Sequence, residues 1–313
     1  MSIASPTALP STPTWRTWSL RVAPYAVTGA VVAAILHRYP AADIARQMAA
    51  GHALRMLPLG LALPFVLWLP YATYDRIVFK GAIGPIALRD VVRAKAAIAV
   101  LLTLGYWVGG GGYALWLART TRVGAARAAG AVLYLMASDL IAVCGVAGAS
   151  MWLGGPGAAT PLRTVATWVF GVQVALILVG PYGGWMRLPR LFEPWRTVPR
   201  GWSLLQILGR ALNIAIIAGF TWAAMRAFGL EVPVGAAATY VPVIALVTSL
   251  PINVAGLGAA QAAWLLLLPW ASGPQLLAFQ VLWHVASGLG LLARGVPFVR
   301  GIAREIEDGK AML

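Results

Sequence analysis

Acidic and metal-binding side chains are scarce in this sequence. Of its 313 residues only 9 are Asp or Glu, 3 are His and 1 is Cys. One cysteine cannot form an intrachain disulfide, and no Asp-x-x-Asp or His-x-x-x-His pair lies within an apolar stretch. Membrane enzymes that act on lipid phosphates usually need several carboxylates around a metal or an acid–base pair. We therefore predict that the protein is not an enzyme and that it has no catalytic residue, metal site or cofactor.

Charge of either sign is also rare, at 11% of residues, whereas 60% of the residues are hydrophobic. A chain of this length and composition has too little polar surface to face water on all sides, which predicts a membrane protein. The remaining charges are mostly basic and give a formal net charge of +15. A nucleic-acid-binding protein would need a soluble scaffold with basic faces, whereas membrane proteins collect Lys and Arg in cytoplasmic loops, near anionic headgroups. We expect anionic membrane lipids as partners and no nucleic acid.

The apolar residues form runs typical of membrane-spanning helices, which need about 20 residues to cross about 30 Å of hydrocarbon. The runs cover residues 22–36, 53–73, 96–118, 128–153, 164–186, 204–229 and 234–293. Prolines break the last run, so seven to nine hydrophobic segments result. The predicted fold is all-α, a polytopic integral membrane helical bundle. Residues 22–300 are expected to form one transmembrane domain between cytoplasmic tails at residues 1–21 and 301–313.

The loops between the runs predict the orientation of the chain, because cytoplasmic loops are enriched in Lys and Arg. Basic residues gather at 76–95, at 187–200 and at 300–310. The loop after the fourth run carries only Arg163, and residues 272–274 carry no charge. We therefore expect the three basic segments to be cytoplasmic and the other two loops to face outward.

One loop conflicts with simple crossings. Arg119, Arg122 and Arg127 follow the run at 96–118 and would lie outside if that run crossed the membrane. A re-entrant hairpin that enters and leaves from the cytoplasmic side removes the conflict. Four consecutive glycines, Gly109–Gly112, lie inside the run, and each glycine costs a helix about 1 kcal/mol relative to Ala. We expect the chain to double back there.

A second broken segment is expected near the end of the chain. Residues 234–250 and 259–270 flank a Pro- and Gly-containing turn, and together they would enter and leave from the outer side. Two broken segments of opposite sense predict an inverted repeat, which in transporters encloses a site near the bilayer midplane. The alternative is that both segments are ordinary Gly-rich spans.

Asp139 is the deepest carboxylate of the chain. It lies 12 residues past Arg127, which places it roughly 18 Å into the membrane at 1.5 Å per residue. An acid at that depth should face the bundle interior and pair with a cation, a polar group or water. It would act either as a structural link between helices or as a substrate-path or proton-coupling group. His284 is expected at a similar depth, either as a packing residue or as a headgroup ligand.

Arg210 and Arg294 lie inside or at the ends of apolar runs. Both would either extend to the membrane surface or bind phosphate through the planar guanidinium. Residues 250–261 read Leu-Pro-Ile-Asn-Val-Ala-Gly-Leu-Gly-Ala-Ala-Gln. A helix is expected to begin near Ala259, and its first N–H groups would form an anion site. The predicted substrate-binding residues are Asp139, Asn253, Gly256, Gly258, Gln261, His284, Arg210 and Arg294.

This motif resembles the flippase-like membrane domain family, typified by the transmembrane half of lysylphosphatidylglycerol synthase. The shared features of the motif are Leu-Pro, a turn that ends in Gly-Leu-Gly, and a polar residue three positions later. The earlier part of the chain is similar too, with a Gly-rich break, a basic loop and a helix of small residues that reaches Asp139. The resemblance extends from about Arg93 to Arg294. Gln261 stands where the family usually has an acid, and Trp283-His284 where it has Tyr-Arg. The resemblance implies movement or presentation of lipids between leaflets of a bacterial-type inner (plasma) membrane.

The leading hypothesis is a flippase-like transporter of an anionic or isoprenoid-linked lipid. One alternative is a non-catalytic membrane partner of a lipid or envelope biosynthesis enzyme, with its basic loops as docking surfaces. The other is a membrane enzyme acting on lipid phosphates. Because residues 301–313 are too few for a synthase half, we expect no aminoacyl transfer.

Overall fold

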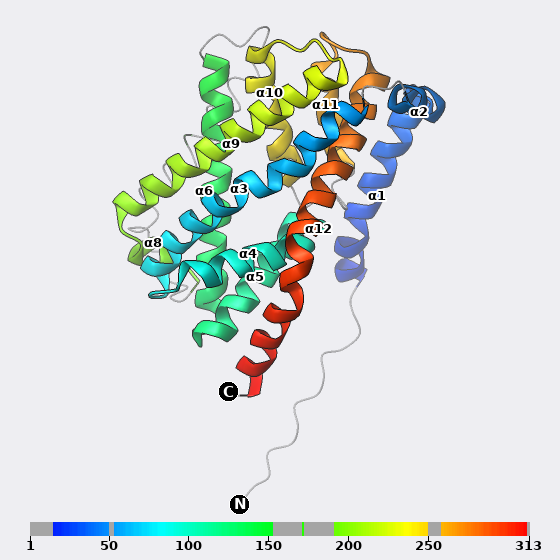
Figure 1. Cartoon of the computed structure of the whole chain (residues 1–313). Coiled ribbons are helices and arrows are strands. Elements are labelled where there is room, and N and C mark those ends of the chain that lie inside the picture. Colours follow the sequence, from blue (N-terminus) through cyan, green and yellow to red (C-terminus); the bar gives the residue numbers. More distant parts are fainter. Residues whose placement is uncertain (1–14, 50–52, 153–170, 172–190, 250–257, 312–313) are drawn as a thin grey trace, which may run out of the picture.

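The computed structural model describes residues 15–49, 53–152, 171, 191–249 and 258–311 (Figure 1). Each element within these ranges is a helix, which confirms the all-α prediction for the described part of the chain. The helices are α1 (Trp15–Arg38), α2 (Ala41–Ala49), α3 (Ala53–Ala82), α4 (Leu88–Leu102), α5 (Tyr106–Thr121), α6 (Ala125–Trp152), α8 (Pro194–Thr197), α9 (Arg200–Phe228), α10 (Val234–Ser249), α11 (Ala259–Trp264), the 3-10 turn η3 (Leu265–Leu267) and α12 (Gly273–Ala311).

Four of these helices, α3, α6, α9 and α12, are long and apolar enough to cross a membrane. Large apolar side chains stand exposed along three of them, such as Phe65 on α3, Leu208 on α9 and Leu289 on α12. Apolar side chains exposed in this number are stable against lipid and not against water. The described chain is therefore a helical membrane bundle. The run expected at 164–186 lies outside the described residues, except for residue 171.

The two ends of the predicted transmembrane domain differ from the expected boundaries. Helix α1 begins at Trp15, within the segment expected to be an N-terminal tail. Helix α12 continues to Ala311, so the expected C-terminal tail is the end of a long helix. Ile302 is buried there, and Glu305 pairs with Arg93 of α4 at 3.1 Å. The last turns of α12 thus belong to the packed bundle.

Helices α4 and α5 form a hairpin, but its break is not at the four glycines. The chain turns at Thr103–Gly105, where Gly105 has φ 154° and ψ 149°, a conformation that only glycine adopts readily. Gly109–Gly112 lie inside α5. A Cβ at Gly109 or at Gly112 would collide with a leucine of α4, so these glycines serve close packing of the two arms instead of a turn.

Helices α10 and α11 lie where the second broken segment is expected. The ring of Tyr240, in the middle of α10, lies 5.8 Å from the ring of Trp270, which follows η3, and α10 also packs on α11. The turn expected at residues 251–257 lies outside the described residues. Gly258 has φ 102° and lies against Thr28 of α1, whose hydroxyl oxygen would be 2.8 Å from an added Cβ. The expected helix start at Ala259 is confirmed.

The basic segments gather at one end of the bundle. Nε of Arg127, at the start of α6, donates to the carbonyl oxygen of Ala82, at the end of α3 (2.9 Å). The same guanidinium pairs with Glu193 at 3.2 Å. The ammonium of Lys80 lies 5.3 Å from the ring of Trp202, at the start of α9. The loop that follows α5 therefore shares an end of the bundle with the described parts of the other basic segments.

Candidate functional site

Asp75 of α3 is a fully buried carboxylate with two basic partners. Its side chain is 0% exposed, and its Oδ2 accepts from the ammonium of Lys95 on α4 at 2.8 Å. Its Oδ1 accepts from Nη2 of Arg210 on α9. Both carboxylate oxygens are thus in ion pairs with helices that lie far apart in the sequence.

Arg210 joins Asp75 to a second carboxylate. Its Nη1 lies 3.0 Å from Oδ1 of Asp139 on α6. The other oxygen of Asp139 accepts a hydrogen bond from the Tyr106 hydroxyl on α5 at 2.9 Å. The acid expected to pair with a cation inside the bundle therefore does so. Its side chain is 22% exposed, whereas that of Arg210 is 1% exposed.

We call Asp75, Lys95, Asp139 and Arg210 the ionic cluster. It holds two acids and two bases, and one residue comes from each of α3, α4, α6 and α9. Buried charges are stable only when they are paired and further hydrogen-bonded. Asp75 meets this condition through its two ion pairs, and Asp139 through the Tyr106 hydroxyl and Arg210. Asp139 is the more exposed acid of the cluster, although its Oδ1, which faces Arg210, is buried.

Aromatic rings surround the two bases. The ring of Tyr71 on α3 lies 4.4 Å from the guanidinium carbon of Arg210 and 5.2 Å from the ammonium of Lys95. Tyr113 of α5 faces the same ammonium at 5.2 Å. A cation over an aromatic face gains about 0.5–2 kcal/mol, so the rings fix the bases in position without adding charge.

A polar face of α9 continues from Arg210 in both directions. Gln206, Arg210, Asn213 and Thr221 are all buried and fall within an arc of roughly 80° at 3.6 residues per turn. With its amide oxygen directed at Arg210, Gln206 accepts from Nε at 2.9 Å and donates to the carbonyl of Tyr74 at 2.8 Å. Among the described residues, neither amide atom of Asn213 has a hydrogen-bond partner, and neither does the hydroxyl of Thr221. We call these four residues the α9 polar face.

A glycine lets α9 approach α3 closely enough to form the cluster. Gly209 lies against the ring of Tyr74, which an added Cβ would overlap. Figure 1 shows α3 and α9 running side by side. The contact holds Arg210, the next residue, within reach of Asp75.

Arg294 of α12 is buried away from the ionic cluster. It is 6% exposed, its Nη1 donates to the carbonyl of Pro64, and its guanidinium lies 5.8 Å from the ring of Trp68. Arg210 is buried as well, so the interpretation that these two arginines extend to the membrane surface is wrong for both.

The other predicted site residues also lie elsewhere. His284 is partly buried on α12, Gly258 lies against α1, and Gln261 is buried in α11. Asn253 and Gly256 lie outside the described residues. Helix α11 has only six residues, and the N–H of Gln261 already donates to the carbonyl of Gly258 at 3.0 Å. Because so short a helix has little dipole and few free donors, the anion site expected at its start is not supported.

Two residues of the ionic cluster, Asp75 and Lys95, are not among the predicted site residues. The sequence predicts Lys95 in a cytoplasmic loop, but α4 begins at Leu88 and carries Lys95 two turns into the bundle. Asp75 follows the run that was expected to end at residue 73, whereas α3 continues to Ala82. The available signal was the apolar Val78, Phe79 and Ala82 at helical spacing after Asp75.

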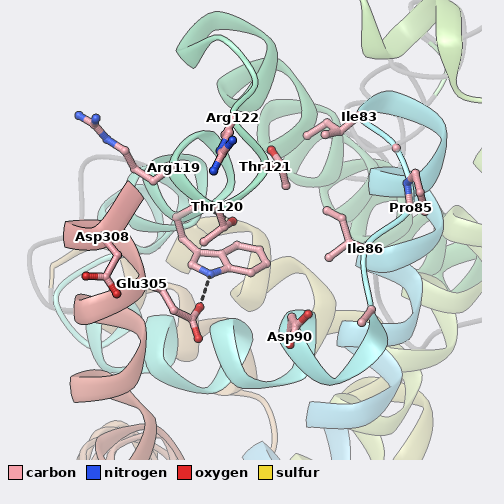
Figure 2. Close-up of a pocket in the computed structure, with 13 residues that line it drawn as sticks. Ile83, Pro85, Ile86, Asp90, Arg119, Thr120, Thr121, Arg122, Glu305 and Asp308 are labelled. Carbon is pink, nitrogen blue, oxygen red and sulfur yellow. Dashed lines mark hydrogen bonds between the residues drawn. The ribbon is translucent and has the colours of Figure 1, made fainter. Parts of the chain in front are cut away.

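A surface pocket of about 680 Å³ opens at the basic end of the bundle, between the loop after α3, the end of α5 and the end of α12 (Figure 2). Arg119 and Arg122 line it together with Asp90, Glu305 and Asp308. Nε1 of Trp116 donates to Glu305 at 3.2 Å, and Figure 2 shows this contact within the pocket.

The pocket is connected to the ionic cluster through aromatic rings. The Trp116 indole stacks on Tyr113, with centroids 5.7 Å apart and planes 23° apart. Tyr113 in turn faces Lys95. Two rings therefore lie between the pocket and the buried ammonium. Within the described ranges, no group of three or more His, Cys, Asp or Glu side chains is arranged to hold a metal ion.

Comparison of the sequence with models of known protein families finds no match, and comparison with curated proteins finds none either.

Proposed function

We propose that this protein moves or presents a lipid with an anionic or isoprenoid-linked phosphate headgroup between the two leaflets of a membrane. The observation that carries the proposal is the ionic cluster. Four ionisable residues lie inside an apolar bundle, and one acid, Asp139, is partly exposed. Ionisable residues at such positions are costly, and in membrane proteins they mark substrate and ion pathways.

Arg210 is the proposed headgroup ligand. Its guanidinium can donate to two phosphate oxygens at once, and in a site without water such charge-assisted hydrogen bonds are strong. The unpartnered amide of Asn213 and hydroxyl of Thr221 extend this polar surface along α9. From Gln206 to Thr221 the α9 polar face is roughly 22 Å long at 1.5 Å per residue. That length is most of the hydrocarbon thickness. The face is buried in this structure, so it would line a headgroup path only after the bundle opens, while the tails stay in lipid.

The membrane topology is part of the proposal. Helices α4 and α5 would dip into the membrane from the cytoplasmic side, and α10 and α11 from the outer side, as in an inverted repeat. Both termini would be cytoplasmic, in an inner (plasma) membrane, as in the flippase-like family that the motif at residues 250–261 resembles.

Cysteine labelling tests this topology. With Cys144→Ser removing the native thiol, a single cysteine at Arg122→Cys should react with a membrane-impermeant maleimide only from the cytoplasmic side. A cysteine at Ser272→Cys should react only from the outer side, and it is the matched control. Reaction of both from the same side would exclude the proposed topology.

Lipid exchange tests the function itself. The purified protein is placed in phosphatidylcholine vesicles that contain a few per cent of fluorescent phosphatidylglycerol or short polyprenyl phosphate. Labelled lipid from the inner leaflet should then move to the outer leaflet, where an added quencher reaches it. The exchange rate should exceed that of protein-free vesicles at least tenfold, and labelled phosphatidylcholine should not move faster. Rates equal to those of protein-free vesicles for both anionic probes would count decisively against transport.

A second candidate function is a non-catalytic partner that docks another protein. The pocket at the basic end, with basic and acidic side chains around Trp116, favours this alternative. Under this alternative, cells that carry Arg119→Glu with Arg122→Glu would show the same defect as cells that lack the protein. The purified wild-type protein would give no lipid exchange in vesicles.

A further inference from the structure

The two acids of the ionic cluster differ in how firmly they hold Arg210. Asp75 is 0% exposed and uses both oxygens in ion pairs. Asp139 contacts Arg210 through one oxygen, Oδ1, at 3.0 Å. Within the described part of the chain, neither this buried oxygen nor Nη1 of Arg210 makes a hydrogen bond. Asp139 is also the acid with solvent-accessible surface, at 22%. Of the two, Asp139 is the counter-ion that can leave.

The charge balance of the cluster limits what can bind there. Two acids and two bases sum to zero, so an anionic headgroup on Arg210 would add an uncompensated negative charge to a buried site. Uncompensated buried charge is strongly unfavourable. A proton taken up by the displaced carboxylate restores neutrality.

On the basis of the proposed function, we infer that Asp139 is an exchangeable counter-ion, so that an anionic lipid headgroup binds Arg210 together with one proton on Asp139. In this exchange the proton adds to the Asp139 carboxylate, and the ion pair with Nη1 of Arg210 breaks. The N–H of Nη1 then donates to an oxygen of the lipid phosphate. The ion pairs of Asp75 with Nη2 of Arg210 and with Lys95 persist throughout, so the guanidinium stays in position.

The groups that face Asp139 support this assignment. Among the described residues they are Arg210 from α9 and the Tyr106 hydroxyl from α5. Behind Arg210 lie Tyr71 and Asp75 from α3 and Lys95 from α4. Helix α10 also packs on α6 and carries no charged residue. The charged residue of α8 is Arg196, exposed at the basic end. Asp139 is therefore the one acid among these groups that can gain a proton without leaving a base unpaired, because Asp75 still pairs with both Lys95 and Arg210.

The experiment is proton-linked binding. Full-length protein in detergent is titrated with dioctanoyl phosphatidylglycerol, whose phosphate stays ionised between pH 6 and 8, in two buffers with different ionisation enthalpies. The wild type should take up close to one proton per lipid bound, and its affinity should fall at least tenfold from pH 6 to pH 8. Dioctanoyl phosphatidylcholine should show neither effect. Absence of proton uptake, or of binding at every pH, would overturn the inference.

Two variants make the test specific. Asp139→Asn should bind the same probe with affinities within twofold at pH 6 and 8 and with no proton uptake. The same pH dependence as in the wild type would overturn the assignment to Asp139. Tyr106→Phe removes the hydroxyl that donates to the carboxylate, so protonation becomes easier and the midpoint of the affinity curve should move to higher pH. This variant leaves all four charges in place and therefore keeps the test usable if Asp139→Asn does not fold; an unmoved midpoint would contradict the inference.

Binding and transport can fail separately. Proton-linked binding without lipid exchange in vesicles would refute transport and leave the exchangeable counter-ion standing. Lipid exchange that is equally fast at pH 6 and 8, together with binding that takes up no proton, would refute the exchangeable counter-ion and leave transport standing.

Discussion

Asp75→Asn is expected to destabilise the protein more than any other single substitution of an acid, by about 3–5 kcal/mol. The carboxylate is fully buried and pairs with both Lys95 and Arg210. An amide keeps the shape but leaves two cations to share the remaining acid, Asp139. Breaking a buried pair costs more than the pair contributes, because the partner stays buried without compensation. Unfolding of the detergent-solubilised protein, followed by circular dichroism as a function of denaturant, measures the loss.

Asp43→Asn is the matched control for this substitution. Asp43 forms an ion pair with Arg46 of α2, but both side chains are exposed, at 37% and 78%. Exposed pairs contribute about 0–1 kcal/mol, so the free energy of unfolding should change by less than about 1 kcal/mol. Equal losses for the two variants would mean that the ionic cluster is not a principal source of stability.

Arg210→Lys is expected to lower the rate of anionic lipid exchange about 10- to 150-fold. Arg210 contacts Asp75, Asp139 and Gln206 through three different nitrogen atoms, and a lysine ammonium cannot reach all three. Loss of one charge-assisted hydrogen bond costs about 1.5–3 kcal/mol. At about 1.4 kcal/mol for each factor of ten in rate, this cost corresponds to the expected 10- to 150-fold decrease. The charge is unchanged, so the effect reports the planar geometry of the guanidinium. Quencher access to labelled lipid in vesicles measures it.

Arg93→Lys is the matched control for an arginine-to-lysine substitution. Arg93 makes one ion pair, with Glu305, in which the two side chains are 43% and 33% exposed. A lysine can keep such a contact, so exchange should stay within twofold of the wild type. If Arg210→Lys behaved in the same way, Arg210 would not be a headgroup ligand.

The sequence predicted the helical class and the shared end of the basic loops because both follow from composition over many residues. Long apolar runs produce helices in lipid whatever their neighbours are, and basic residues are excluded from hydrocarbon. Asp139 could be found because it is an isolated acid within a long apolar run. Its partner Arg210 could be named as a candidate for the same reason.

The pairing of these residues could not be predicted. Arg210 meets Asp75 across 135 residues, a contact that depends on how α3 and α9 pack. The predicted position of the first hairpin turn is wrong because the prediction treats the glycines as a helix break, whereas Gly109 and Gly112 provide room for α4. Glycine has both uses, and its neighbours in space decide between them. Lys95 was missed because a basic residue near the end of an apolar run has the same pattern in a loop and in a buried helix.

The spacing of the cluster along the chain has a consequence for biosynthesis. Lys95 follows Asp75 by 20 residues and Arg210 follows it by 135. At about 5–20 residues per second, the ribosome supplies Lys95 within about 1–4 s of Asp75, and Arg210 only after about 7–27 s. We expect the nascent chain to present Asp75 to the insertion machinery as a neutral pair with Lys95. Asp139 would enter without a base of its own, and the late arrival of Arg210 would then join the first half of the polypeptide to the second.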